Sequence, residues 1–110
     1  MEHVSFVLHI HPDHEAEYFR RHRQVYPELE EAFGQAGIKR YHIYYHDGTL
    51  FAYMIVEHFG EAMQMLANHP ANARWQAYMS DLLLPWEDGE NVKVIREAYR
   101  YVQESLHEKA

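Results

Sequence analysis

The fold is decided by residues 39–57, which read KRYHIYYHDGTLFAYMIVE. Near their centre, Asp47 and Gly48 separate two runs rich in aromatic and β-branched residues. Asp-Gly in that setting is the strongest short-range signal for a β-hairpin. We therefore expect strands over residues 39–46 and 49–57, joined by a two-residue turn.

A two-residue turn also fixes the register of the hairpin, and the register decides which side chains share a face. One face pairs Tyr45 with Leu50, Ile43 with Ala52 and Tyr41 with Met54, and the other pairs Tyr44 with Phe51 and His42 with Tyr53. Both faces carry large apolar groups, whereas a sheet with one face in water alternates apolar and polar residues. We therefore expect a homodimer, packed sheet to sheet. The alternative is that a few exposed tyrosines lie on a solvent face.

The segments around the hairpin predict the rest of an α+β domain. Residues 4–10 alternate with the period of a strand, and Pro27 stands where a helix begins. We expect helices over residues 13–24, 27–35, 60–67 and 71–84, and a last strand over 92–102. The resulting order β-α-β-β-α-β is that of the ferredoxin-like split βαβ fold. Residues 1–102 form one predicted domain, and residues 103–110 a solvated tail.

Composition limits the classes of function. The chain has 110 residues, 47% of them hydrophobic, and a formal charge of −7, which suits one globular domain and disfavours nucleic-acid partners. No apolar run is long enough to span a membrane, no signal peptide is expected, and the absence of cysteine removes thiolate chemistry. The cytoplasm is therefore the expected compartment.

Ten histidines and 15% aromatic residues suit a pocket for a neutral, hydroxylated ligand, although the plainer interpretation is that tyrosines fill the core.

Three residues are candidates for chemistry. Tyr18 and His22 lie four positions apart on a predicted helix, so their side chains are neighbours on one face. Imidazole is the natural proton-transfer group near neutral pH, although a histidine at a helix end is more often simply hydrogen-bonded to its surroundings. Trp75 offers a flat apolar surface to the C–H side of a sugar ring, or else belongs to the core.

Other sites are not expected. The histidines do not have the spacing of a zinc site, so we expect no metal. No glycine-rich phosphate loop follows a strand, and no serine lies in a nucleophile motif. The acidic run Glu28, Glu30 and Glu31 is interpreted as a solvated helix face rather than a carboxylate pair.

Residues 18–29, YFRRHRQVYPEL, resemble the Tyr-x-Arg-Arg-His-x-x-x-Trp-Pro-Glu-Leu signature of the L-rhamnose mutarotases. The similarity continues through Gly37, residues 41–44 and residues 50–52, and through residues 74–81, RWQAYMSD, where that family has Arg-Trp-Trp-x-Tyr-Met-x-Asp. It covers about residues 4–100. The resemblance implies a dimeric α/β barrel that interconverts the α and β anomers of L-rhamnose without a cofactor.

The resemblance also implies roles for individual residues. It makes His22 the proton donor and Tyr18, Tyr41 and Trp75 sugar-binding residues. The next family position is a tryptophan that is Gln76 here, and Tyr26 also replaces a family tryptophan. These two departures suggest another 6-deoxy or aldose sugar as substrate.

Mutarotation opens a hemiacetal and recloses it, and the residues suit that chemistry. His22 would protonate the ring oxygen and retrieve the proton on closure. The residues do not identify the base that takes the proton of the anomeric hydroxyl; water and a Tyr-bound hydroxyl are candidates. Two other functions stay open as well: a cofactor-free monooxygenase or haem-degrading enzyme of the same barrel class, and a non-catalytic sugar-binding module.

Overall fold

The computed structural model describes residues 1–103 as one sheet and a layer of helices. The strands are β1 (Glu2–Ile10), β2 (Ile38–His46), β3 (Thr49–Val56), β4 (Leu83–Leu84) and β5 (Lys93–Ile95). The helices are the 3₁₀ turn η1 (Pro12–His14), α1 (Glu15–His22), α2 (Pro27–Gln35), α3 (Phe59–Ala67) and α4 (Pro70–Met79).

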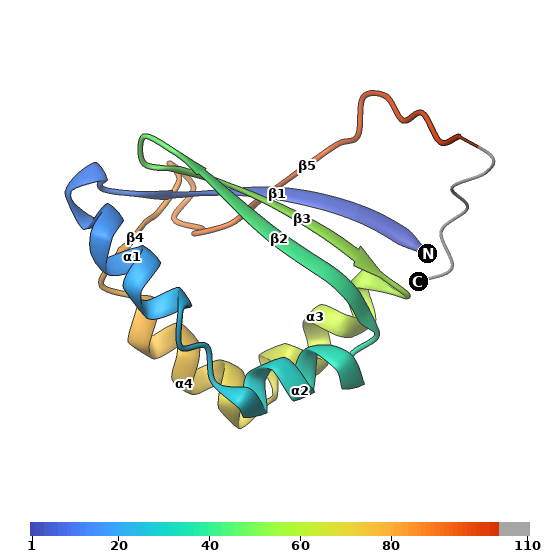
Figure 1. Ribbon diagram of the computed structural model, residues 1–110, viewed down its shortest axis with the longest axis horizontal. Helices are drawn as coiled ribbons and strands as arrows, with labels where there is room; N and C mark the ends of the chain where they lie inside the picture. Colours follow the sequence, from blue (N-terminus) through green and yellow to red (C-terminus); the bar gives the residue numbers. More distant parts are fainter. Residues whose placement is uncertain (104–110) are drawn as a thin grey trace.

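All strand pairs are antiparallel, and the order across the sheet is β2-β3-β1-β4, with β5 also pairing with β1. The sheet is curled, and α1 to α4 all lie on its concave side (Figure 1). This arrangement confirms the predicted ferredoxin-like α+β fold. Within residues 1–103 no helix has the length and apolar character needed to cross a membrane.

The hairpin between β2 and β3 has the predicted register. Tyr41 pairs with Met54 and Tyr45 with Leu50. Asp47 and Gly48 have φ values of 45° and 88°, the left-handed conformation that this turn type requires. A Cβ atom on Gly48 would lie 2.8 Å from the carbonyl oxygen of Ile10, so this position also needs glycine for space. The turn therefore joins β2 and β3 and contacts the end of β1.

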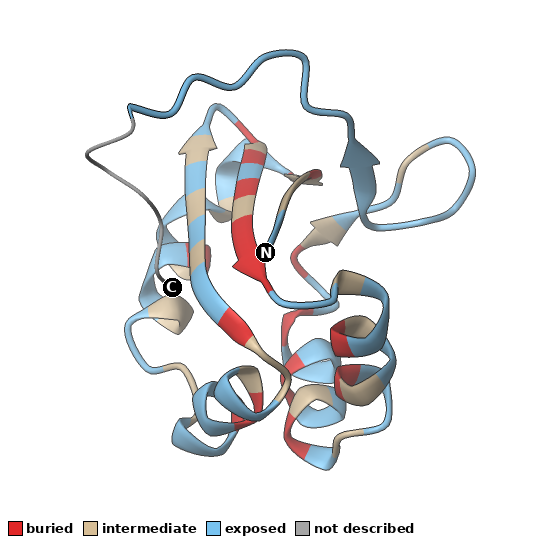
Figure 2. Ribbon diagram, turned by 90° about the vertical axis from the view of Figure 1, so that its right-hand side faces the viewer, coloured by how far each residue is buried: buried red, intermediate tan, exposed pale blue. Residues whose placement is uncertain are grey.

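The core lies between the concave face of the sheet and the helices. The most deeply buried side chains include Leu50, Met54 and Val56 of β3 and Leu29 of α2. Figure 2 shows buried residues both on the strands and on the helices beside them. They belong to two clusters of buried residues, one formed with α2 and α3 and the other with α1, α2 and α4. The pocket described below opens where these clusters meet.

Two predicted elements end earlier than expected. The helix predicted over residues 71–84 ends at Met79, because Leu83 and Leu84 instead pair with the end of β1. The strand predicted over residues 92–102 is confined to Lys93–Ile95, and the following residues to 103 have no regular structure. Figure 1 shows this last segment running away from the sheet, where no neighbouring strand pairs with it. Of the predicted tail, residues 104–110 lie outside the described residues.

Candidate active site

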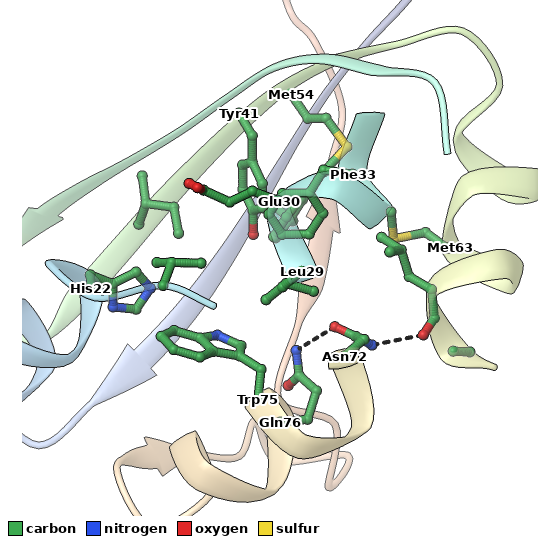
Figure 3. A pocket seen from close by; sticks show the side chains of 15 residues that line it. His22, Leu29, Glu30, Phe33, Tyr41, Met54, Met63, Asn72, Trp75 and Gln76 are labelled. Atoms are coloured by element: carbon green, nitrogen blue, oxygen red, sulfur yellow. Dashed lines mark hydrogen bonds between the residues drawn. The ribbon is translucent and has the colours of Figure 1, made fainter. Parts of the chain in front are cut away.

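A pocket of about 470 Å³ lies between the sheet and the helices (Figure 3). Four of the predicted site residues line it: His22, Tyr41, Trp75 and Gln76. They come from α1, β2 and α4, so the fold brings together residues that are more than 50 positions apart in the chain. Tyr18 lies behind His22 and is not part of the pocket wall.

His22 is held by its own helix. Its Nδ1 lies 3.1 Å from the backbone carbonyl oxygen of Tyr18, one turn earlier. A carbonyl oxygen only accepts, so Nδ1 carries the proton and donates it, and the neutral ring has its lone pair on Nε2. Burial lowers the pKa of His22 below 6.5, and the bond to Tyr18 opposes that shift in part. The neutral imidazole therefore predominates at pH 7, with Nε2 as a proton acceptor.

Tyr18 supports the imidazole from behind. The two rings stack with centroids 4.3 Å apart, and Tyr18 is almost fully buried. Burial raises the pKa of the Tyr18 phenol, so the ring is neutral. The spacing of four residues predicted this neighbourhood, and the stack restricts the rotation of His22.

Trp75 forms the adjacent wall from α4. Its ring meets that of His22 edge to face, with centroids 5.3 Å apart, and meets Tyr26 in the same way at 5.2 Å. Trp75 is buried, with 7% of its surface exposed, and the rings of His22 and Tyr26 fix its orientation. Part of the indole thus belongs to the core, as the plainer interpretation expected, while the rest lines the pocket.

Tyr41 lines the pocket from the sheet. Its side chain shares a face with Met54, as the hairpin register predicted, and that face proves to be the concave one; Tyr41 packs there against the rings of Phe6 and Phe33 at centroid distances of 6.0 and 5.6 Å. Burial raises the pKa of Tyr41 to about 12. Its hydroxyl therefore stays protonated over the whole neutral range and can donate a hydrogen bond.

The pocket has lining residues that the sequence analysis missed. Glu30 borders it while remaining exposed, as expected for the acidic run, and Asn72 lines it from α4. Phe33 and Met63 form an apolar part of the wall. The helical spacing supplied a signal, because Glu30 and Phe33 lie on successive turns near buried Leu29, and Asn72 lies one turn before Gln76.

Arg21 joins the two helices that carry His22 and Trp75. Its guanidinium bonds Glu17 of α1 at 2.6 Å and Asp81 after α4 at 2.9 Å. It also donates to the backbone carbonyl of Tyr78 at 2.6 Å and lies over the ring of that residue. The bond from Arg21 lowers the pKa of Asp81, and the pKa of Glu17 is lowered by Arg20 first and by Arg21 second. The contacts of Arg21 connect α1 to the end of α4.

Comparison with known proteins places the chain in a family. Residues 3–103 match the family model described as L-rhamnose mutarotase. An L-rhamnose mutarotase of Burkholderia cenocepacia (strain HI2424) is 36% identical over 94 residues, which cover 84% of this chain and 90% of that protein.

Two solved structures share the fold. An L-rhamnose mutarotase from Formosa agariphila has a TM-score of 0.79 at 24% identity, covering 93% of this chain and 100% of that one. Tetracenomycin F2 cyclase from Streptomyces glaucescens, a type-II polyketide cyclase, has a TM-score of 0.62 at 15% identity, covering 94% and 99%. At these identities the likeness concerns the fold alone. The family match spans almost all described residues and the Burkholderia relative agrees with it, so the chain belongs to the L-rhamnose mutarotase family.

Proposed function

We propose that this chain is an isomerase that interconverts the α and β anomers of L-rhamnose or a close 6-deoxy sugar. The observation that carries the proposal is the state of His22: Nδ1 is committed to the carbonyl of Tyr18 and the ring lines a pocket beside Trp75. Nε2 makes no hydrogen bond to the described part of the chain, so it is available to a ligand.

In the proposed reaction, His22 moves one proton across the hemiacetal. Ring opening breaks the O1–H and C1–O5 bonds and forms the C1=O1 and O5–H bonds. Neutral His22 accepts the proton of O1 at Nε2 and then, as the imidazolium, donates it to O5. After rotation about C1–C2 the same transfers run in reverse, and His22 returns to its initial state. Proton transfer of this kind contributes roughly 10²- to 10⁴-fold to a rate.

The other predicted residues would bind and orient the sugar. Trp75 offers an apolar ring to the C–H face of the pyranose. The neutral hydroxyl of Tyr41 would donate a hydrogen bond to a sugar oxygen, and Gln76, which lines the pocket, would contact the sugar. Tyr18 would act through His22, because the stack fixes the imidazole and the phenol lies outside the pocket wall.

Anomer exchange measured by NMR saturation transfer tests the proposal. Wild-type protein should raise the exchange rate of L-rhamnose above the rate in buffer, and His22→Ala should remove roughly 10²- to 10⁴-fold of that acceleration. His58→Ala is the matched control, because His58 is exposed at the start of α3 and does not line the pocket. A wild-type rate equal to that of buffer would contradict the proposal, and sugar binding without acceleration would identify a binding module.

We also propose that the protein is a homodimer formed through the convex face of the sheet. Tyr44 and Phe51 on that face are 60% and 45% exposed. Beyond β5, Tyr99 and Tyr101 are 81% and 73% exposed. Protein interfaces are enriched in tyrosine, so these side chains are suited to contact with a second copy. A second copy would cover these groups.

A further inference from the structure

The pocket wall contains a pair of amide side chains that the proposed proton transfer does not use. Asn72 and Gln76 lie four positions apart on α4 and both line the pocket. The Nδ2 of Asn72 donates to the carbonyl oxygen of Leu66 at 3.0 Å, which turns its Oδ1 toward Gln76. The Nε2 of Gln76 donates to that Oδ1 at 3.5 Å, and both bonds are visible in Figure 3.

This pair leaves polar atoms of Gln76 available to a ligand. An amide group has two N–H donors and one carbonyl acceptor, and Asn72 engages one donor. The Oε1 of Gln76 makes no hydrogen bond within residues 1–103. Asn72 is itself anchored on Leu66, and its Oδ1 accepts from the exposed Gln76 amide at the pocket wall. A neutral amide of this kind is suited to a neutral hydroxyl group.

The pair lies at the border of an apolar part of the pocket. Phe33, Met63 and Leu66 line that part, and the bond from Asn72 ends on the backbone of Leu66. In Figure 3, Trp75 lies between His22 and Gln76, with Asn72 and Met63 beyond them. With the anomeric carbon at His22, the C5 methyl of a 6-deoxy sugar is the substituent that suits the apolar part. The pair would then lie next to that methyl group.

We infer that Asn72 and Gln76 form a subsite for a hydroxyl group on C6, so that this chain accepts sugars with a hydroxymethyl group as well as 6-deoxy sugars. The inference rests on the proposed mutarotase function. The amides bond each other when no hydroxyl is present, and Gln76 is exposed, so water can satisfy its remaining polar atoms beside a 6-deoxy sugar. A site that demands a hydroxyl would instead reject the deoxy sugar strongly. The pocket of about 470 Å³ lies within the range of ordinary small-molecule sites and has room for the additional oxygen.

The test compares L-rhamnose with L-mannose, which has the same structure with one added hydroxyl on C6. Anomer exchange is measured by NMR for both sugars with wild type, Gln76→Leu and Gln64→Leu. Gln64 is the matched control, because it is exposed on α3 and does not line the pocket. We expect wild-type kcat/KM for the two sugars to agree within about tenfold, since one hydrogen bond changes a rate constant by about that factor.

Gln76→Leu should lower kcat/KM for L-mannose by roughly five- to tenfold more than for L-rhamnose. Gln64→Leu should leave the ratio of the two sugars unchanged. An equal effect of Gln76→Leu on both sugars would overturn the inference, as would a wild-type protein that accelerates L-rhamnose and leaves L-mannose at the buffer rate. A wild-type protein that accelerates neither sugar would overturn the proposed function and this inference with it, so the two failures are distinguishable.

Discussion

The imidazole of His22 stacks on the ring of Tyr18, with centroids 4.3 Å apart and an interplanar angle of 26°. The backbone carbonyl of the same tyrosine accepts the Nδ1 proton of His22. One residue therefore fixes both the orientation and the tautomer of the imidazole. A helix can supply this arrangement on its own, because residues four positions apart are neighbours on its surface.

The pH dependence of the rate follows from the state of His22. Burial lowers its pKa below 6.5, so the ring is neutral and able to accept a proton at pH 7. As the pH falls through the lowered pKa, His22 becomes protonated and kcat/KM should fall, with a midpoint below 6.5. Tyr41, with its pKa raised to about 12, should cause no loss of activity up to about pH 10. NMR exchange rates measured from pH 4.5 to 10 provide the profile, and an acidic midpoint above 6.5 would contradict the assignment.

The indole of Trp75 should contribute mainly to sugar binding. Trp75→Leu removes the flat ring from the pocket and should raise KM by roughly tenfold, the effect of losing one aromatic contact. The control is Trp86→Leu, because Trp86 contacts His9 and the carbonyl of Val7 and lies outside the pocket. A change in kcat alone, with KM unchanged, would argue against stacking as the role of Trp75. Thermal unfolding of both variants checks that they fold.

Much of the fold follows from local sequence signals. Asp47-Gly48 sets a two-residue turn, and that turn fixes the register of β2 and β3 without reference to the rest of the chain. The residues at which α4 and β5 end could not be predicted from local sequence signals. Leu83 and Leu84 follow a helical pattern in the sequence, but pairing with β1 decides their conformation. Pairing across distant segments overrides local propensity there.

The parts of the site that depend on residues close together in the sequence could be predicted. The spacing of Tyr18 and His22 indicated their contact, and the hairpin register placed Tyr41 on the same face as Met54. Helical spacing places Glu30 near buried Leu29 and Asn72 near Gln76, but whether these side chains border the pocket depends on how α2 and α4 pack against the sheet. Tyr18 lies outside the pocket wall, and its ring stacks on that of His22 within the same helix.

Arg21 should stabilise the contact between the two helices that carry the site. Its side chain is only 10% exposed and it bonds to Glu17, Asp81 and the backbone of Tyr78. Arg21→Leu should lower Tm by on the order of 5 °C, because it leaves Asp81 and the carbonyl of Tyr78 without their cation, whereas Glu17 keeps its bond to Arg20. The neighbouring Arg20 is 56% exposed, and its ion pair with Glu17 lies within α1, so Arg20→Leu should change Tm far less. Equal shifts in Tm for the two variants would contradict this assignment.

The proposed dimer can be tested by a charge on the convex face of the sheet. Phe51 lies on that face with 45% of its surface exposed, so Phe51→Glu should leave the protomer folded. A second sheet packed against this position would bury the new carboxylate without a partner, which strongly disfavours association. Sedimentation velocity should therefore show a dimer for wild type and a monomer for Phe51→Glu. Phe19→Glu provides the matched control, because Phe19 is 44% exposed on α1, on the helical side of the sheet. A Phe19→Glu dimer beside a Phe51→Glu monomer would place the interface on the convex face, whereas a monomeric wild-type protein would show that the exposed tyrosines of that face lie in solvent.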